Sequence, residues 1–308
     1  MKTIHIKQVD AFCGKTFSGN PAGVVLDAEG LTDQEMQSIA RELNNPETAF
    51  ILKPTLPEAD IQIRWFIPKE EVPLCGHATI AGFHALAESS LAGMKSNGQH
   101  YFQLQTRSGL LAVRVETNFH GIGVELELPK PNFKIKKTIS RQLLSSLTLK
   151  PADLDKKLPV VSDTYLYIPI KHRERVHRLK PDFSRLAQLC TSANFLGVCV
   201  FTLDTIERTS AVHSRFFAPS CGIDEDPVTG SANGPLGVYL YQFVRPTGTA
   251  LAVKELTDGR IEYIGEQGDV LDRPGRVHIR LRCKHDAVDD VSIGGEALTV
   301  FETTLSLK

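Results

Sequence analysis

The 308-residue sequence predicts an α+β fold made of two equivalent, strand-rich lobes, each built around a buried helix. The main observation is an internal repeat: Arg64–Pro68 (RWFIP) recurs as Arg215–Pro219 (RFFAP), and the Pro-x-x-Gly turn at 73–76 recurs at 227–230. The offsets between the copies are 151 and 154 residues, close to half of the chain. Solenoid repeats recur at much shorter intervals, so one large duplication is indicated. It predicts two similar lobes, and a cleft between lobes is a common place for a small-molecule site.

Strands are indicated in both halves by alternation of apolar and polar residues. The clearest examples are Ile61–Trp65, 113–115, Val124–Leu128 and Val277–Leu281. We expect these short strands to pair antiparallel.

Helices are fewer and well marked. Thr32–Glu35 is a capping box, and the apolar residues after it share one face of a helix that should end near Asn44. Segments Gly76–Leu91 and Gly230–Phe243 are rich in Ala and Gly and have no polar face of normal width. Such helices belong inside a core, so we expect one in each lobe, wrapped by the strands of that lobe.

Composition excludes several functions. The 35 basic and 36 acidic side chains nearly cancel, so no overall positive field recruits nucleic acid or an anionic membrane. The start of the chain has no apolar signal-peptide region and no segment is apolar enough to span a membrane, so a cytoplasmic protein is expected. The six cysteines lack metal-binding spacing and no nucleotide-binding glycine motif is present. We therefore expect no metal and no cofactor.

The chemistry is expected where the two buried helices begin, at Gly76 and Gly230. Exposed amides at a helix start bind carboxylates without a metal or a basic side chain, and glycine allows close approach. A small carboxylated molecule between the lobes is the expected ligand. The alternative is that both turns are merely tight strand-to-helix connections with capping side chains.

The titratable groups at these turns differ between the copies. The first turn has Cys75 and His77, and the second has Asp226 and Ser231. A partly buried Asp226 would have a raised affinity for protons and His77 would titrate near neutrality, so either could exchange protons with a carbon acid. The alternatives are a turn cap for Asp226, a core histidine for His77 and a small buried apolar side chain for Cys75.

Five segments of the chain, given at the end of this paragraph, closely resemble the PhzF-like isomerases of phenazine biosynthesis, which are relatives of diaminopimelate epimerase. The resemblance covers essentially the whole chain. It implies that each lobe is a β-barrel-like sheet around a central helix, and that the protein is a cofactor-free, usually homodimeric isomerase. The matching segments, in order, are Val9–Phe12 (VDAF), Gly19–Val25 (GNPAGVV), Pro46–Phe50 (PETAF), Glu71–Thr79 (EVPLCGHAT) and Glu225–Ala232 (EDPVTGSA).

The resemblance also implies the site. Glu47 matches the principal acid/base of the family, and His77, Asp226 and Ser231 match its other polar groups, which hold substrate and supply protons. Asn20, in the first glycine-rich segment, is expected to contact substrate together with the helix starts. Glu47 would move a proton from an activated carbon to a distal carbon of one conjugated system. From the residues alone, Glu47 is only a loop or strand-edge carboxylate.

The resemblance implies that residues from about 297 to 308 return to the N-terminal lobe of residues 1–120, leaving 121–296 for the C-terminal lobe. Two departures from the family pattern stand out. Pro46 precedes Glu47, where many relatives have Ser, and this fixes the local backbone. Ala232–Pro235 (ANGP) is closer to uncharacterised bacterial relatives than to the phenazine enzyme itself.

Two other functions compete with this hypothesis. One is an epimerase or racemase that uses two cysteines, but Cys75 lies 11 residues after Arg64 whereas Cys221 lies 6 after Arg215, so the thiols are not at matched positions. The other is a non-catalytic protein that binds a small molecule on the same fold, because a fold does not guarantee a function.

Overall fold

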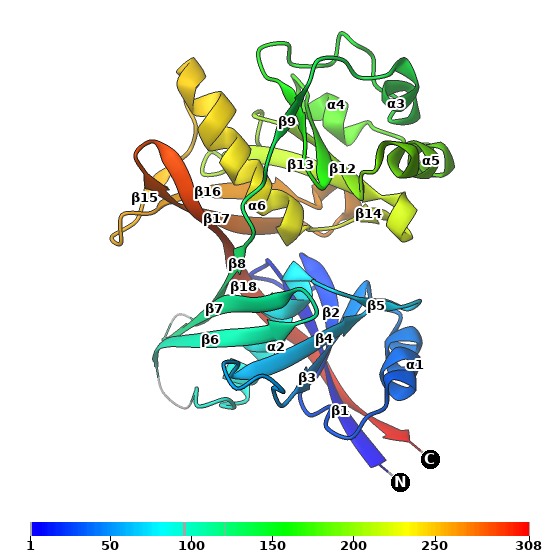
Figure 1. The fold of residues 1–308 in the computed structure, drawn as a ribbon, viewed down its shortest axis with the longest axis vertical. Coiled ribbons are helices and arrows are strands. Elements are labelled where there is room, and N and C mark those ends of the chain that lie inside the picture. Colours follow the sequence, from blue (N-terminus) through cyan, green and yellow to red (C-terminus); the bar gives the residue numbers. More distant parts are fainter. Residues whose placement is uncertain (1, 95–96, 120, 308) are drawn as a thin grey trace. The chain divides into compact units, whose positions relative to one another are not determined.

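The computed structural model describes residues 2–94, 97–119 and 121–307. The chain forms two compact units, Met1–Leu128 with Ser292–Lys308 and Pro129–Val291 (Figure 1). The first unit continues past residue 120 because the strand at 121–128 pairs with the strand before it. The long last strand, β18 (Ala287–Leu307), begins in the second unit and ends in the first.

The first unit is a closed barrel around a helix, α2. Pairing runs from β18 through β1, β2, β3, β4, β6, β7 and β8 and back to β18. Helix α2 packs against β1, β2, β3, β7 and β8, and its residues 76–87 are all buried, which explains why it has no polar face. Besides β18, the elements of the first unit are β1 (Lys2–Ala11), β2 (Asn20–Val25), α1 (Asp33–Leu43), β3 (Glu47–Leu52), β4 (Ile61–Phe66), β5 (Glu71–Val72), α2 (Gly76–Glu88), β6 (Gly98–Thr106), β7 (Gly109–Asn118) and β8 (Gly121–Leu128).

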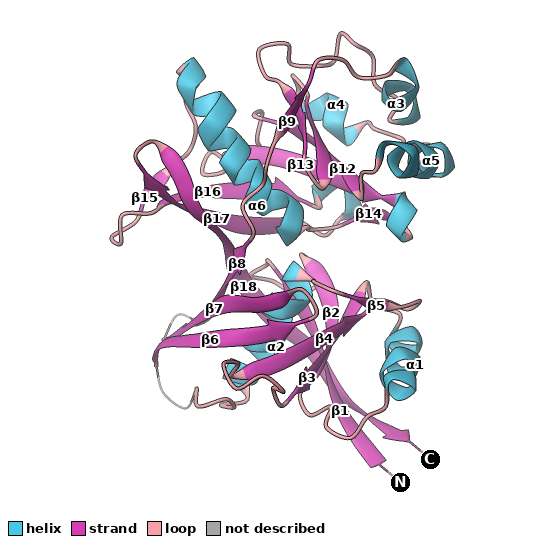
Figure 2. Cartoon of the chain, viewed as in Figure 1, coloured by secondary structure: helices cyan, strands magenta, loops and turns pink. Residues whose placement is uncertain are grey.

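The second unit also places a helix, α6, against its strands (Figure 2). Helix α6 packs on β16 and β17, and Gly237 permits this approach because a Cβ there would lie 2.3 Å from Cγ2 of Ile279. The elements are β9 (Lys134–Lys136), α3 (Arg141–Ser146), β10 (Val160–Ser162), β11 (Tyr165–Pro169), α4 (Arg173–His177), α5 (Phe183–Ala193), β12 (Gly197–Thr202), β13 (Val212–Ala218), η1 (Pro219–Cys221), β14 (Ile223–Asp226), α6 (Gly230–Tyr239), η2 (Leu240–Val244), η3 (Arg245–Thr247), β15 (Lys254–Glu255), β16 (Ile261–Gln267), η4 (Asp269–Leu271) and β17 (Gly275–Lys284).

The two units repeat one another element by element, which confirms the predicted α+β fold of two pseudo-symmetric lobes. Strands β2, β3 and β4 pair as β11, β12 and β13 do, and β4 pairs with β6 as β13 pairs with β16. The expectation of antiparallel pairing was only partly right. The pairs β2–β3, β4–β6, β11–β12 and β13–β16 are parallel, because a helix or a helix-containing connection separates the two strands of each pair.

The repeated arginine has the same role in both units. Arg64 in β4 makes a bidentate ion pair with Glu71 in β5. Its Nε donates to Oε1 at 2.8 Å and its Nη2 donates to Oε2 at 2.7 Å. Arg215 in β13 bonds Glu225 in β14 in the same way, at 2.7 and 2.6 Å. Each pair fixes the hairpin that leads into the buried helix.

The predicted local signals are largely confirmed. Thr32 and Glu35 form the capping box of α1, and Asn44 ends that helix in the left-handed conformation, with φ of 52°. All four predicted strands are present. Helix α2 ends at Glu88, three residues before the expected limit, and α6 ends at Tyr239, where a π-helical turn continues it.

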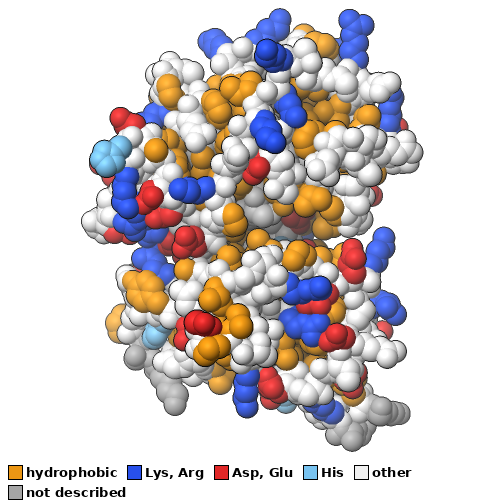
Figure 3. Space-filling model, in the orientation of Figure 1, with side chains coloured by type: hydrophobic (Ala, Val, Ile, Leu, Met, Phe, Trp, Pro, Cys, Tyr) orange, Lys and Arg blue, Asp and Glu red, His pale blue; other side chains and the backbone are white. Residues whose placement is uncertain are grey.

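The described part of the chain contains no helix that is both long and apolar enough to cross a membrane. On the face shown in Figure 3, both basic and acidic side chains are visible on each unit, with basic side chains more frequent near the top of the view. This mixture agrees with the near-zero net charge of the sequence.

Candidate active site

Glu47 is the first residue of β3 and is placed there by the end of α1. The left-handed conformation of Asn44 reverses the chain, and β3 then pairs parallel with β2, bringing Glu47 opposite Ala22. The side chain is turned inward, since Glu47 is 8% exposed. Among the described residues no lysine or arginine forms an ion pair with it.

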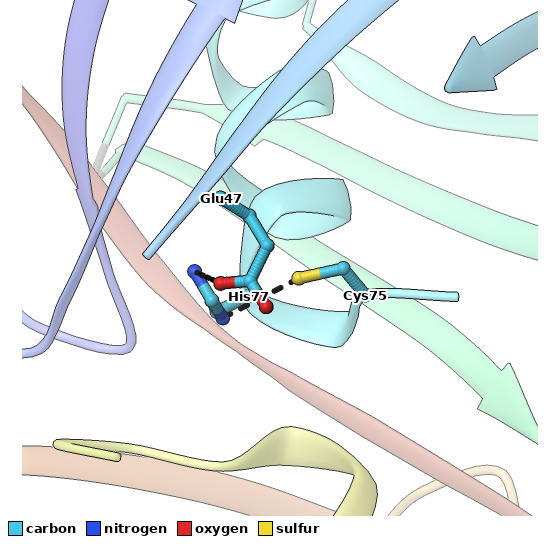
Figure 4. Close-up of side chains that lie close together, drawn as sticks. All are labelled: Glu47, Cys75 and His77. Atoms are coloured by element: carbon cyan, nitrogen blue, oxygen red, sulfur yellow. Dashed lines mark hydrogen bonds and ion pairs between the residues drawn. The ribbon is translucent and has the colours of Figure 1, made fainter. Parts of the chain in front are cut away.

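His77 is the second residue of α2 and is the charged partner of Glu47 (Figure 4). Its Nε2 lies 3.2 Å from Oε2 of Glu47, and the histidine is 4% exposed. The contact between Nε2 of His77 and Oε2 of Glu47 does not have the geometry of a hydrogen bond. Any attraction between the two side chains is therefore mainly electrostatic. The other ring nitrogen, Nδ1, lies 3.1 Å from Nδ2 of Asn20 and 3.5 Å from Sγ of Cys75.

The surroundings of His77 shift the pKa values of this cluster. Burial lowers the pKa of His77, whereas Cys75 and Glu47 raise it, and the net direction is well upward. Burial and the Glu47 carboxylate raise the pKa of Cys75 to about 11. The raised pKa keeps the thiol neutral at physiological pH, which leaves Glu47 as the acidic neighbour of the imidazole. The predicted titration of His77 near neutrality stays a prediction, and the direction of the shift places its pKa above the usual value.

Glu47, Cys75 and His77 offer oxygen, sulfur and nitrogen atoms within 4.8 Å of one another, a grouping that can hold a metal ion. However, Glu47 faces Nε2 of the imidazole and Cys75 faces Nδ1. Each neighbour therefore contacts a different nitrogen of the ring, and the group is a candidate both for proton exchange and for a metal ion.

In the second unit, Asp226 ends β14 and is 7% exposed. Its Oδ2 accepts a hydrogen bond of 2.5 Å from the hydroxyl of Thr229. The side-chain amide of Gln267 donates to the Asp226 carbonyl at 2.8 Å and to Oγ1 of Thr229 at 3.0 Å. This network fixes the turn before α6. The predicted rise in the proton affinity of Asp226 stays a prediction.

Ser231 is the second residue of α6, at the position that His77 occupies in α2. Its hydroxyl lies 3.0 Å from that of Tyr165. The helices begin at Gly76 and Gly230, both buried, and neither N-cap residue, Cys75 or Thr229, caps its helix through a side-chain hydrogen bond. The first-turn amides are thus without side-chain acceptors at these caps.

The cysteines occupy different environments in the two units. Cys75 is buried at the start of α2, as expected, but it also contacts His77. Cys221 ends the short helix η1 and is exposed. The residue that matches Cys75 at the start of α6 is Thr229.

The structure thus brings Glu47, His77 and Asn20 together in the first unit, and it places Asp226 and Ser231 around the start of α6 in the second. Sequence reasoning did not identify Tyr165, whose hydroxyl contacts that of Ser231, or Gln267, whose side-chain amide donates to the Asp226 carbonyl. No local pattern distinguishes either from an ordinary strand residue.

Proteins similar to this chain over its whole length are named isomerases. An uncharacterised isomerase of Clostridium acetobutylicum is 36% identical over 100% of this chain and 99% of its own length. YfhB of Bacillus subtilis, also named an uncharacterised isomerase, is 33% identical over 100% of both chains.

The family described as phenazine biosynthesis-like protein (PhzC-PhzF) matches residues 9–303, and the chain belongs to this family. The crystal structure of a PhzF-family phenazine biosynthesis protein from Bacillus anthracis aligns with a TM-score of 0.85 at 31% identity, over 100% of both chains. The predicted relationship to the PhzF-like isomerases, and to their uncharacterised bacterial members, is confirmed.

Proposed function

We propose that this protein is a cofactor-independent isomerase that moves a proton within a small carboxylated substrate resembling an amino or hydroxy acid. The observation that supports this most directly is the buried pair of Glu47 and His77, with 3.2 Å between oxygen and nitrogen. Carboxylates and imidazoles are among the groups that act as general acids and bases.

In this reaction Glu47 acts as the base. Its carboxylate takes a proton from an activated carbon of the substrate and becomes a carboxylic acid. It then returns the same proton to a distal carbon of the conjugated system, so the substrate is rearranged without net gain or loss of atoms. His77 favours the ionised form of Glu47, because its positive charge stabilises the carboxylate before and after the transfer.

A single carboxylate suits a shift of a proton along one face of the substrate. Inversion of a stereocentre requires two groups on opposite faces. In the part of the chain that the structure describes, the strand position that matches Glu47 in the second unit is Gly197, which has no acid or base.

A substrate carboxylate would be bound by backbone amides at the start of a buried helix. The start of a helix attracts an anion, and neither Cys75 nor Thr229 makes a side-chain capping hydrogen bond there, which supports this part of the proposal. From the family resemblance, Asp226 and Ser231 would hold the amino and hydroxyl groups of the substrate, and Asn20 would contribute to its binding.

The family resemblance also leads us to propose a homodimer. Size-exclusion chromatography with light scattering tests this directly, and a monomer at micromolar concentration would contradict it.

The proposed reaction is tested by deuterium incorporation from D2O, followed by NMR. The panel would contain small amino and hydroxy acids with a conjugated double bond, including 2,3-dihydro-3-hydroxyanthranilate, and diaminopimelate. We expect exchange in the wild type, its loss in Glu47→Gln and its retention in Glu42→Gln, which changes an exposed carboxylate on α1.

The same experiment separates the alternatives. Exchange that survives Glu47→Gln but disappears in Cys75→Ala or Cys221→Ala would replace the proposal with a thiol-dependent epimerase. Saturable binding of a panel member without exchange would indicate the non-catalytic binding protein.

A further inference from the structure

A second cluster of titratable side chains lies wholly within the second unit and has no part in the proposed reaction. It consists of His177, the last residue of α4, His213 in β13 and Glu266 in β16. The parallel pairing of β13 with β16 puts His213 directly opposite Glu266. His213 and Glu266 are both 0% exposed.

Glu266 orients the ring of His213. Its carboxylate accepts hydrogen bonds from the backbone N–H groups of Ile206 at 2.8 Å and Glu207 at 2.7 Å. Both carboxylate oxygens of Glu266 therefore serve as acceptors, and Oε2 also faces Nδ1 of His213, 3.1 Å away. This orients the His213 ring so that its Nε2 faces His177.

The two histidines meet through these Nε2 atoms. The nitrogens are 3.0 Å apart, while the ring centroids are only 4.8 Å apart with 49° between the ring planes. One Nε2 donates a hydrogen bond to the other, and a metal ion bound by both nitrogens would take the place of that proton. Two imidazole nitrogens that each bind one metal ion at about 2.0–2.1 Å are about 3 Å apart when they are adjacent ligands.

The surroundings hold this geometry. Nη1 of Arg215 donates to the carbonyls of Val176, His177 and Leu179, which fixes the end of α4 that presents His177. Arg215 is itself paired with Glu225, so its positive charge is balanced. His177 is only half-buried, so an ion can reach the pair from its side.

We propose that His177 and His213 bind one divalent transition-metal ion that prefers imidazole ligands, such as Ni²⁺, Cu²⁺ or Zn²⁺. Glu266 acts as a positioning residue. It orients the His213 ring, as the carboxylate partners of metal-bound histidines do. Water completes the coordination on the side of His177. The site is separate from Glu47 and His77, and it does not depend on the proposed isomerase reaction.

The test is isothermal titration calorimetry of tag-free protein with Ni²⁺, which does not oxidise the free thiols. We expect one ion to bind to the wild type and the affinity to fall at least 10-fold in His177→Gln. Glu266→Gln, which removes the charge but keeps an acceptor, should lower the affinity by about 10–100-fold. His177 is the main test because it is the less buried histidine, so its replacement is best tolerated by the fold.

Two controls locate the ion. His172→Gln changes an exposed histidine at the start of the same helix, whose side chain makes no capping bond, and should leave binding unchanged. His77→Gln should also leave it unchanged. Failure of the wild type to bind Ni²⁺, or equal binding by His177→Gln, would overturn the proposal. Loss of binding in His77→Gln alone would also overturn it, by assigning the ion to the Glu47–Cys75–His77 group.

Discussion

Glu47 and Gly197 occupy equivalent positions in the two halves of the duplicated fold. Each is the first residue of a strand, β3 or β12, that pairs parallel with the strand before it. Each follows by three residues an asparagine, Asn44 or Asn194, that ends a helix in the left-handed conformation. At this position the first unit therefore carries the carboxylate of Glu47, whereas the second unit has Gly197, which has no side chain.

Gly197 cannot easily be replaced. A Cβ at this position would lie 2.6 Å from Cζ of Phe216 and 2.8 Å from the carbonyl oxygen of Phe217. We expect Gly197→Ala to lower the free energy of unfolding by about 1–3 kcal/mol, because the aromatic ring and the strand must move. Urea unfolding measures this. In the matched control, Gly123→Ala in β8, a Cβ would meet nothing within 4 Å, and an equal loss there would contradict the packing argument.

The two repeated arginines should differ in their contribution to stability. The side chain of Arg215 is 6% exposed and that of Arg64 is 21% exposed. Arg215→Met leaves Glu225 buried and unpaired and removes the hydrogen bonds to three carbonyls, so we expect a loss of about 3–5 kcal/mol. Arg64→Met should cost less, because Glu71 keeps an ion pair with Arg107 and the second partner of Arg64, Asp33, is 79% exposed. Equal shifts of the urea midpoint would show that burial does not decide the effect.

The stabilising effect of His77 should depend on pH. Its pKa in the folded protein is raised, so its contribution is present in full below the unfolded pKa of about 6.5 and is lost as the pH rises through the folded pKa. The difference in unfolding free energy between the wild type and His77→Gln should therefore shrink from pH 6 to pH 9. A difference that grows with pH would mean that His77 is neutral in the folded protein.

The thiols should react in order of their exposure and charge state. Cys221 is exposed, whereas Cys75 is buried and its pKa is raised to about 11. At pH 7.5 a thiol reagent should modify Cys221 well before Cys75, since the thiolate is the reactive form. Mass spectrometry of the digested protein identifies the labelled residue. Rapid labelling of Cys75 would support a thiol-dependent epimerase instead.

The architecture was largely predictable because its signals are local or repeated. The capping box at Thr32 needs only four residues to be recognised. The arginine motif is visible because it occurs twice, and the structure gives it a reason, a bond from Arg64 to Glu71 and an equivalent bond in the second unit. The parallel pairs were missed because pairing direction depends on connections that no single strand encodes.

The candidate site was predictable only in part. His77 and Asp226 stand beside conspicuous glycine turns, whereas Glu47 follows a proline in a segment without a pattern of its own, and only the family resemblance indicated it. The second cluster gave no signal, because His213 lies 36 residues from His177 and 53 from Glu266. Contacts at such separations come from the folded chain and not from spacing.

The pairing of β1 with β18 has a consequence for how the chain is made in the cell. Lys2 pairs with Leu307 and Ala11 with Ala297, so one wall of the first barrel joins segments about 300 residues apart. On a ribosome, β1 would emerge about 300 residues before this neighbour, with one edge open to pairing with other chains. The first barrel therefore closes only after β18 has been made, and truncation near the end of β18 would expose an edge of β1.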